Sequence, residues 1–151
     1  MLLLVASLAS CTMIDKIMNN KEATLGDKIE EEKIVYDGAA MEYVSHTSDT
    51  LTVKITNGTE STWQSGNMRD YRLEAEQGGE WYQVNQIGEF ANTMELMLFT
   101  PGQTLTHTFE FADRYGALPA GKYRVVKSFW ANATATAEAH EFLLICEFTV
   151  E

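Results

Sequence analysis

The sequence has few basic residues, and this scarcity excludes one class of partner. Eleven Lys and Arg stand against 22 Asp and Glu, which gives a formal net charge of −11 over 151 residues. Such a negative surface repels phosphate backbones, so nucleic acid is not an expected partner. Hydrophobic residues make up 45% of the chain. That share is typical of globular proteins, and the length suits one folded domain.

Catalytic and metal-binding patterns are also lacking. The three histidines, His46, His107 and His140, are dispersed along the chain, and no serine-hydrolase elbow, phosphate-binding loop or His-Glu-x-x-His motif occurs. His107 lies at an apolar position of its strand, which favours a core histidine. His140 is close to Glu138 and Glu141, but adjacent strand residues point to opposite faces, which favours a solvated loop end. We therefore predict no catalytic residues, no cofactor and no metal.

No apolar run in the first part of the chain is long enough to cross a bilayer, which takes about 20 residues. Residues 1–10 have instead the length of the apolar region of a signal peptide, and Leu8-Ala-Ser-Cys11 resembles the bacterial lipobox. The resemblance implies that Cys11 is the lipid-bearing N-terminus of the mature protein, with two or more acyl chains for stable anchoring. No Lys or Arg precedes the leucines. Two alternatives stay open, a start further upstream and a buried N-terminal strand with a chance cysteine.

Cysteine is scarce as well, with two residues in the chain. If Cys11 carries lipid, Cys146 has no intramolecular partner, so we expect no disulfide. Cys146 shares its strand parity with Phe142, Leu144 and Phe148, and a free cysteine in such a run is typically buried. This pattern predicts a small hydrophobic core residue.

The segment 11–33 is rich in charged and amide side chains and is interpreted as a tether after the anchor. Its apolar residues nevertheless fall close to a period of 3.6, so the tether can form an amphipathic helix interrupted near Gly26. Acids and lysines are mixed on the polar face, which suits a stalk or a helix docked on its own domain better than one lying on anionic lipid. The apolar residues are Ile14, Ile17, Met18, Leu25 and Ile29.

From residue 34 onward, short alternating runs are separated by turn residues. Leu51, Val53 and Ile55 share one face of a predicted strand over 50–56, and Gln77-Gly-Gly79 predicts a hairpin between 70–76 and 80–84. Further strands are expected within 90–99 and over 104–111, 122–130 and 141–150. About seven strands, with no long helical period after residue 33, predict an all-β antiparallel sandwich over 34–151.

Two aromatic residues have predicted structural roles. The turn Leu118-Pro-Ala-Gly121 precedes Tyr123, as in the tyrosine corner of sandwich proteins, in which the phenol bonds back to the connecting loop. Trp81 and Tyr82 are adjacent, so only one of them can face the core. We expect Trp81 in the core, on account of its size, and Tyr82 partly exposed.

The last two predicted strands also define a candidate interaction patch. If Tyr123, Val125 and Phe129 point inward, alternation sends Val126, Trp130, Leu143 and Ile145 outward. An outward apolar cluster usually marks an interaction surface or is covered by another segment. Both alternatives stay open here, with the apolar residues of 12–33 as the internal cover.

Several motifs together carry a family resemblance over residues 41–151. They are Asn57-Gly-Thr, Tyr71-Arg-Leu-Glu, Gly79-Glu-Trp-Tyr-Gln-Val84, Phe99-Thr-Pro-Gly102, the specific run Tyr115-Gly-Ala-Leu-Pro-Ala-Gly-Lys-Tyr-Arg, and Glu147-Phe-Thr-Val150. They resemble a bacterial immunoglobulin-like domain family found in envelope lipoproteins. The resemblance implies an Ig-like β-sandwich on the cell surface and assigns no catalytic or ligand-binding residue.

Three classes of function follow. The first is a non-enzymatic lipid-anchored surface protein of the bacterial envelope, on the outer face of the membrane. Its Ig-like domain serves as a structural module or as a binding or adhesion module for an unknown protein or glycan. The second is a β-sandwich proteinase inhibitor, because Thr100-Pro-Gly-Gln103 and Leu118-Pro-Ala-Gly-Lys-Tyr123 are also similar to turns of an inhibitor family of bacilli that acts inside the cell. The secretion signal argues against that compartment. The third is an enzyme on a sandwich scaffold, which lacks the required clustered residues.

Overall fold

The fold is organised around a long hairpin of two strands, β9 (Gly121–Ala131) and β10 (His140–Val150). The computed structural model describes residues 21–30, 35–90 and 93–151. Within it, β9 and β10 pair antiparallel over their whole length, with Phe129 opposite Phe142. Side chains alternate across the pair, so one face of the hairpin is apolar and buries against the rest of the chain.

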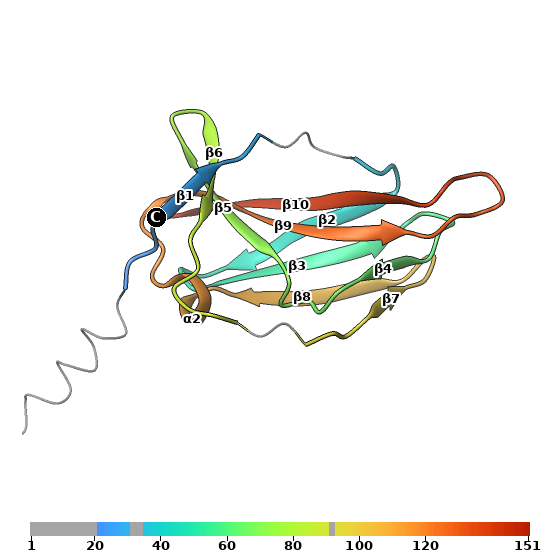
Figure 1. Ribbon diagram of the computed structural model, residues 1–151, viewed down its shortest axis with the longest axis horizontal. Coiled ribbons are helices and arrows are strands. Elements are labelled where there is room, and N and C mark those ends of the chain that lie inside the picture. The colour runs from blue at the N-terminus through green and yellow to red at the C-terminus, as the bar shows by residue number, and fades with distance from the viewer. Residues whose placement is uncertain (1–20, 31–34, 91–92) are drawn as a thin grey trace, which may run out of the picture.

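The other edge of β9 is shared by two shorter strands. Its first half pairs with β5 (Arg72–Gln77) and its end with β4 (Trp63–Ser65). Outside these lie β6 (Glu80–Val84) next to β5 and β7 (Met97–Phe99) next to β4, and β1 (Leu25–Lys28) adds to the edge of β6. These strands form a seven-stranded antiparallel sheet (Figure 1).

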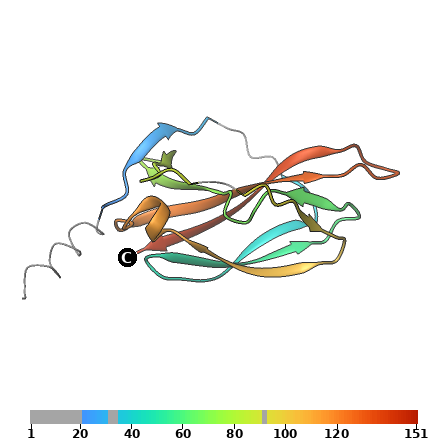
Figure 2. The same cartoon turned by 60° about the horizontal axis from the view of Figure 1, so that its bottom comes forward.

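A smaller sheet forms the second layer. It consists of β2 (Ala39–His46), β3 (Thr50–Asn57) and β8 (Thr104–Glu110), in that order. The single turn α2 (Ala112–Tyr115) follows β8 at one end of the sandwich, and the two layers lie face to face (Figure 2). Within the part of the chain described here, no helix has the length and apolar character to cross a membrane.

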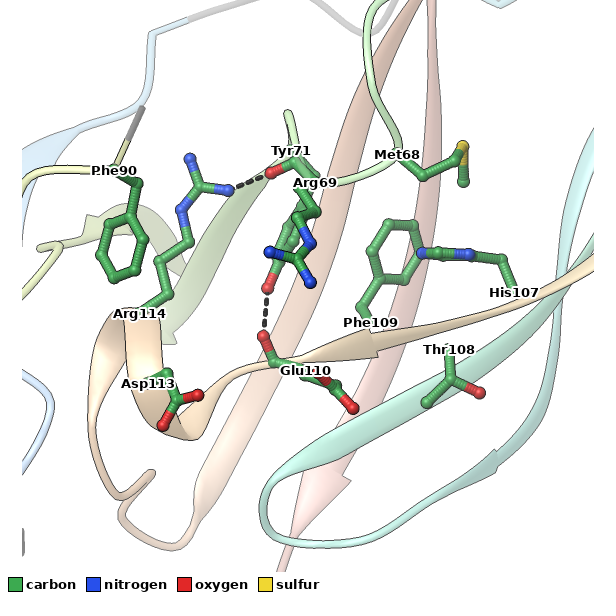
Figure 3. Close-up of a pocket in the computed structure, with 10 residues that line it drawn as sticks. All are labelled: Met68, Arg69, Tyr71, Phe90, His107, Thr108, Phe109, Glu110, Asp113 and Arg114. Atoms are coloured by element: carbon green, nitrogen blue, oxygen red, sulfur yellow. Dashed lines mark hydrogen bonds between the residues drawn. The ribbon is translucent and has the colours of Figure 1, made fainter. Parts of the chain in front are cut away.

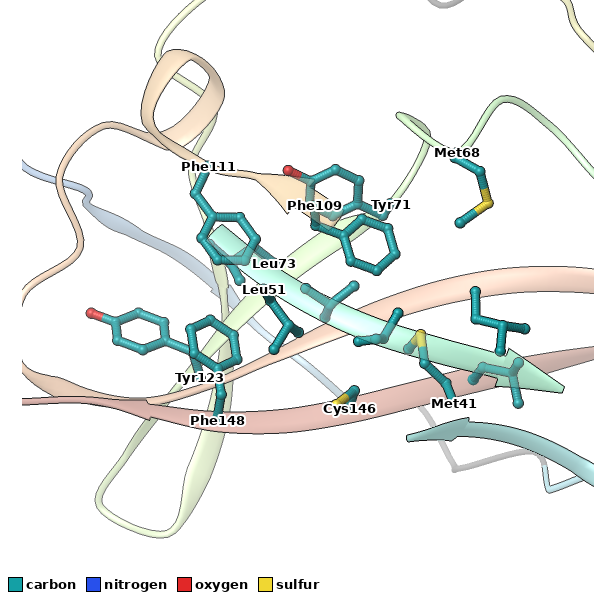
Figure 4. Close-up of a cluster of buried hydrophobic side chains, with 14 of the residues drawn as sticks. Met41, Leu51, Met68, Tyr71, Leu73, Phe109, Phe111, Tyr123, Cys146 and Phe148 are labelled. Atoms are coloured by element: carbon teal, nitrogen blue, oxygen red, sulfur yellow. The ribbon is translucent and has the colours of Figure 1, made fainter. Parts of the chain in front are cut away.

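The core lies between the sheets and is rich in aromatic rings (Figure 4). Leu51, Val53 and Ile55 are fully buried on β3, as the alternation predicts. Trp63 is also fully buried, with ring centroids 4.9 Å from Phe142. The predicted core position of Cys146 is confirmed, and burial raises the pKa of its thiol to about 11.

The predicted hairpin is present, with its turn at the two glycines. Gly78 and Gly79 have φ values of 62° and 83°, the left-handed conformation that a two-residue hairpin turn requires and that glycine adopts at low cost. The described residues contain ten strands, more than the expected seven. The additional ones are β1, β2 and β4: β1 and β4 have only four and three residues, and β2 has eight.

The end of the predicted tether has a different structure from the one expected. Leu25 lies in strand β1, opposite Val84, and not in a helix. Just before it, Ala23 donates a backbone hydrogen bond to Ala117 (2.9 Å), and Ala117 donates one to Lys21 (3.0 Å). The predicted helical positions Ile14, Ile17 and Met18 lie outside the described residues, as does Cys11.

The β1 segment therefore docks on the domain, but not where the sequence suggested. The amide of Ile29 bonds to the carbonyl of Trp81 (2.8 Å), so this segment follows the edge strand β6. It does not cover the outward patch of β9 and β10. A Cβ added at Gly116 would lie 2.0 Å from the carbonyl oxygen of Lys21, so glycine is needed for this close approach.

Candidate functional site

The outward face of the larger sheet carries charged residues at one end and apolar residues at the other. The charged end is built around Glu74, which is fully buried between two arginines. Its carboxylate oxygens lie 2.6 Å from Nε of Arg72 and 2.5 Å from Nε of Arg124. A buried carboxylate requires such partners, because leaving the charge unpaired is costly. Removing either arginine would leave this carboxylate short of a partner and would destabilise the sheet.

Trp81 belongs to this charged face, and the prediction that it lies in the core is wrong. Ala75 faces the core and pairs with Tyr82, so Tyr82 shares the inner face and its neighbour Trp81 points outward. The Trp81 ring lies 4.1 Å from the guanidinium carbon of Arg124, a cation–π contact. Trp81 is half-buried, and the core tryptophan is Trp63.

The apolar end corresponds to the predicted interaction patch. Val126, Trp130, Leu143 and Ile145 have the outward parity that the sequence indicated. Trp130 is 47% exposed, Leu143 and Ile145 are half-buried, and Val126 is buried at 4%. Val126 is buried because Ile145 and Arg72 flank it on the neighbouring strands. The accessible part of the patch is thus centred on Trp130.

The structure adds residues to this patch that sequence reasoning missed. Gln64 lies opposite both Trp130 and Leu98, so a row of outward side chains crosses β7, β4 and β9. Leu98 is 54% exposed and Leu96, just before β7, is 66% exposed. Their weak alternation within 90–99 was the available signal. It did not identify β4 as the strand between them and Trp130.

A shallow hollow lies beside Trp130, and we call it the Trp130 groove. Its volume is about 270 Å³. It is lined by Gln64, Ser65, Gly66, Asp70, Leu96, Ser128, Phe129, Trp130 and Glu141. A second hollow of about 310 Å³ adjoins it, since Asp70 and Ser128 line both. Together they follow the outward face along β9.

Hydrogen bonds hold the polar side chains of the Trp130 groove in place. The Gln64 amide donates to Oδ1 of Asn132 (2.6 Å), and the Ser128 hydroxyl donates to the Glu141 carboxylate. The Ser65 hydroxyl donates to the backbone carbonyl of Ser128 (3.1 Å). An oriented amide and an oriented carboxylate therefore flank an exposed indole ring. Such a surface can stack on a flat ligand and bond to its polar edge.

A larger hollow, of about 370 Å³, lies where β8 meets the loop before β5 (Figure 3). Two of its polar side chains, Tyr71 and Arg114, are bonded within the protein. The Tyr71 hydroxyl donates to the carbonyl of Glu110 (2.6 Å). The buried Arg114 donates to the carbonyl of Arg69, and its guanidinium lies 5.1 Å from the Tyr71 ring and 5.6 Å from the Phe90 ring. These contacts fasten α2 and the loop to the sheet.

The histidines are not brought together. His46 bonds to the Tyr43 hydroxyl (3.0 Å), and the His140 ring lies edge-on to Tyr36 at 4.5 Å. His107 is half-buried, and burial, followed by the charge of Lys127, lowers its pKa. Over the described ranges, no three His, Cys, Asp or Glu residues are grouped so that they could hold a metal ion.

Two antiparallel sheets packed face to face, with a tyrosine corner, define an immunoglobulin-like sandwich. The corner is formed by the Tyr123 hydroxyl, which donates to the carbonyl of Pro119 at 2.6 Å. Residues 35–142 match the family described as bacterial Ig-like domain, and the chain belongs to this family. Comparison with curated proteins gives no match. The matched range begins after β1, so the docked N-terminal segment lies outside it.

Proposed function

We propose that the chain is a lipid-anchored binding module of the bacterial cell envelope. In this proposal, lipid on Cys11 holds the protein at the outer face of the membrane, and the Ig-like domain binds a partner without catalysis. A bacterial Ig-like domain suggests a binding or structural module. The lipobox-like run Leu8-Ala-Ser-Cys11 supports the anchor, and it lies outside the described residues.

The observation that carries the binding role is the exposed apolar row around Trp130. Trp130, Leu98 and Leu96 are among the most exposed large apolar residues of the domain. They belong to β9, β7 and the segment before β7, at the end of the sandwich far from β1 and α2 (Figure 1). Contiguous apolar residues on the surface of a soluble domain commonly mark an interaction site. The docked β1 segment does not cover them.

Of the two turns that suggested the inhibitor alternative, Leu118–Gly121 does not support it. Leu118 is buried, and the Pro119 carbonyl is bonded to Tyr123 within the tyrosine corner. These contacts give the Leu118–Gly121 turn a structural role.

The binding role is tested by co-sedimentation of the purified protein with isolated envelope fragments. We expect saturable binding that Trp130→Ser weakens at least about tenfold, the effect of losing one buried aromatic contact. Tyr43→Ser is the matched control, because Tyr43 is 51% exposed on the smaller sheet. Equal binding by the wild type and Trp130→Ser would contradict the proposal.

The anchor is tested separately by expressing the complete reading frame with a labelled fatty acid. The wild type should take up the label, and Cys11→Ala should not. A variant labelled as strongly as the wild type would show that Cys11 is not the acylated residue.

A further inference from the structure

We infer that the Trp130 groove binds an oligosaccharide that is neutral or carries amino groups. This inference rests on the proposed function and names the class of ligand for the same site. Three properties of the groove support it: an exposed flat ring, fixed polar groups beside that ring, and a lining without positive charge.

The flat ring is the indole of Trp130. It is 47% exposed on an otherwise regular sheet face and lies between Gln64 on β4 and Glu141 on β10. A sugar ring presents an apolar C–H face to an aromatic ring and keeps its hydroxyls at the edge. Tryptophan suits this contact, because it offers a large apolar surface at a low entropic cost.

The polar groups surround the ring at its edges. Gln64 and Asn132 are bonded to each other through one amide hydrogen (2.6 Å), and each side chain keeps further donor or acceptor capacity. Glu141 accepts the Ser128 hydroxyl and retains a second oxygen as an acceptor. Neighbouring sugar hydroxyls both donate and accept, so they match such a mixed set of fixed groups.

The charge of the lining selects among saccharides. Asp70 and Glu141 line the groove, and no Lys or Arg does so among the described residues. The nearby Lys127 points inward, with its ammonium bonded to loop carbonyls. With a net charge of −11 on the whole chain, an anionic polymer is repelled and an amino sugar is attracted.

The adjoining hollow indicates a ligand longer than one ring. It meets the Trp130 groove at Asp70 and Ser128 and continues past the amides of Gln83 and Gln86. Its arginines have partners, since Arg72 pairs with Glu74 and Arg114 bonds to the carbonyl of Arg69. A chain of several sugars can follow this path along β9.

The test follows the indole N–H signals of the full chain by NMR during titration with three oligosaccharides of equal length. These are an N-acetylglucosamine oligomer, its de-N-acetylated cationic form, and an anionic oligogalacturonate. The chain has three tryptophans, and the Trp130 signal is assigned with Trp130→Phe. We expect the neutral and cationic oligomers to shift that signal saturably and the anionic one to leave it unchanged. Added salt should weaken the cationic oligomer selectively.

Two variants sharpen the test. Trp130→Ala should weaken binding of the neutral oligomer at least about tenfold, or about 1.4 kcal/mol. Trp81→Phe should leave it unchanged, because Trp81 lies at the other end of the sheet face against Arg124. Glu141→Gln should reduce the preference for the cationic oligomer over the neutral one. Absence of a saturable Trp130 shift with both oligomers, or equal binding of the anionic one, would overturn the inference.

Failure of this inference can be told apart from failure of the proposed function. Protease treatment of the envelope fragments should leave Trp130-dependent co-sedimentation intact, and the neutral oligomer should compete with it. If protease abolishes that binding, the partner is a protein, so the saccharide inference is wrong and the binding-module proposal stands. If co-sedimentation does not depend on Trp130 at all, the proposed function is wrong.

Discussion

At the scale of single residues, Lys127 is the most unusual member of the core. It has the inward parity of Val125 and Phe129 on β9 and is only 1% exposed. Its ammonium donates to the carbonyls of Asn67 (3.0 Å) and Asp70 (2.8 Å). A buried cation needs such partners, so Lys127 fixes the loop that forms one wall of the Trp130 groove.

Burial of Lys127 predicts a pH dependence of stability. Burial lowers the pKa of Lys127 to about 8, against 10.5 for a free lysine. Between these values the unfolded chain binds the proton and the folded chain does not, so the stability contributed at this position rises with pH. Relative to Lys127→Met, the free energy of unfolding of the wild type should increase by roughly 2 kcal/mol from pH 8 to pH 10.

The variant is needed as a reference because other groups titrate in the opposite sense. Burial raises the pKa of Cys146 to about 11 and also raises the pKa of Tyr71. As pH rises, these groups ionise first in the unfolded chain, and their contribution to the free energy of unfolding falls. Denaturant unfolding of both proteins at each pH isolates Lys127. If the difference in free energy of unfolding between the wild type and Lys127→Met stays constant from pH 8 to pH 10, Lys127 is not desolvated as described.

The tyrosine corner gives a second test at this scale. Tyr123→Phe removes the bond to the Pro119 carbonyl (2.6 Å) and should lower the free energy of unfolding by roughly 1 to 2 kcal/mol. Tyr82→Phe is the control, because the Tyr82 hydroxyl forms no hydrogen bond with the described part of the chain. Denaturant unfolding followed by circular dichroism measures both. Equal effects of the two variants would contradict the assigned role.

Some residue positions followed from the sequence and others did not, for a physical reason. Alternation predicts that neighbours face opposite sides, and it correctly separated Trp130 from Phe129. Phe129 shares its parity with the buried Tyr123 and Val125, which identifies the core side, whereas the short strand 80–84 gives little such help. Trp81 and Tyr82 were assigned by size, whereas the pairing of Tyr82 with Ala75 decides the outcome. That pairing is set by the hairpin register and not by either side chain.

At the scale of elements, β1 extends the family's sandwich by one edge strand. It covers β6, which would otherwise present unpaired backbone groups at the edge of the sheet. Backbone bonds connect Ile29 to Trp81 (2.8 Å) and Asn85 to Thr24 (2.9 Å). The core residues themselves all lie between Met41 and Val150, so β1 adds stability without being needed for the core.

We therefore expect residues 35–151 to fold alone but less stably than residues 21–151. The longer fragment retains several backbone bonds, each worth about 0.5 to 1.5 kcal/mol, so its free energy of unfolding should be greater by roughly 2 to 4 kcal/mol. Circular dichroism should show a β-type spectrum for both, and urea unfolding measures the difference. A helical or unfolded spectrum for 35–151, or equal stabilities, would contradict the role assigned to β1.

Among the strands predicted from the sequence, the best defined are those long enough to alternate. The runs over 50–56, 122–130 and 141–150 correspond to β3, β9 and β10, because each buries one face along its whole length. Short strands such as β4 give too few residues for a period. Leu25 and Ile29 are four residues apart, a spacing that places them on one side of a helix and also of a strand. Only the contact with β6 distinguishes the two.

At the scale of the whole molecule, the position of Lys21 sets the direction in which an anchored domain points. Lys21 is hydrogen-bonded to Ala117 beside α2. This end of the sandwich is opposite the loop that joins β9 and β10 (Figure 1). Nine residues lie between Cys11 and Lys21, and the ten residue steps that join the two span at most about 36 Å. The eleven residues of β10 alone span about 37 Å. If Cys11 carries the proposed anchor, α2 would therefore lie nearer the membrane, on average, than the loop that joins β9 and β10.

This orientation would leave the Trp130 groove facing away from the membrane, and it can be measured on the acylated protein bound to vesicles. A fluorophore on Asp113→Cys, in α2, should be quenched by a quencher at the lipid headgroups more strongly than one on Ala135→Cys, in the β9–β10 hairpin. Both positions are exposed, whereas burial and a raised pKa keep Cys146 from reacting with the label. Unacylated Cys11→Ala carrying the same labels should show no difference between the two positions. Stronger quenching at Ala135→Cys in the acylated protein would mean that the domain lies with the β9–β10 loop toward the lipid, which would block access of a partner to the Trp130 groove.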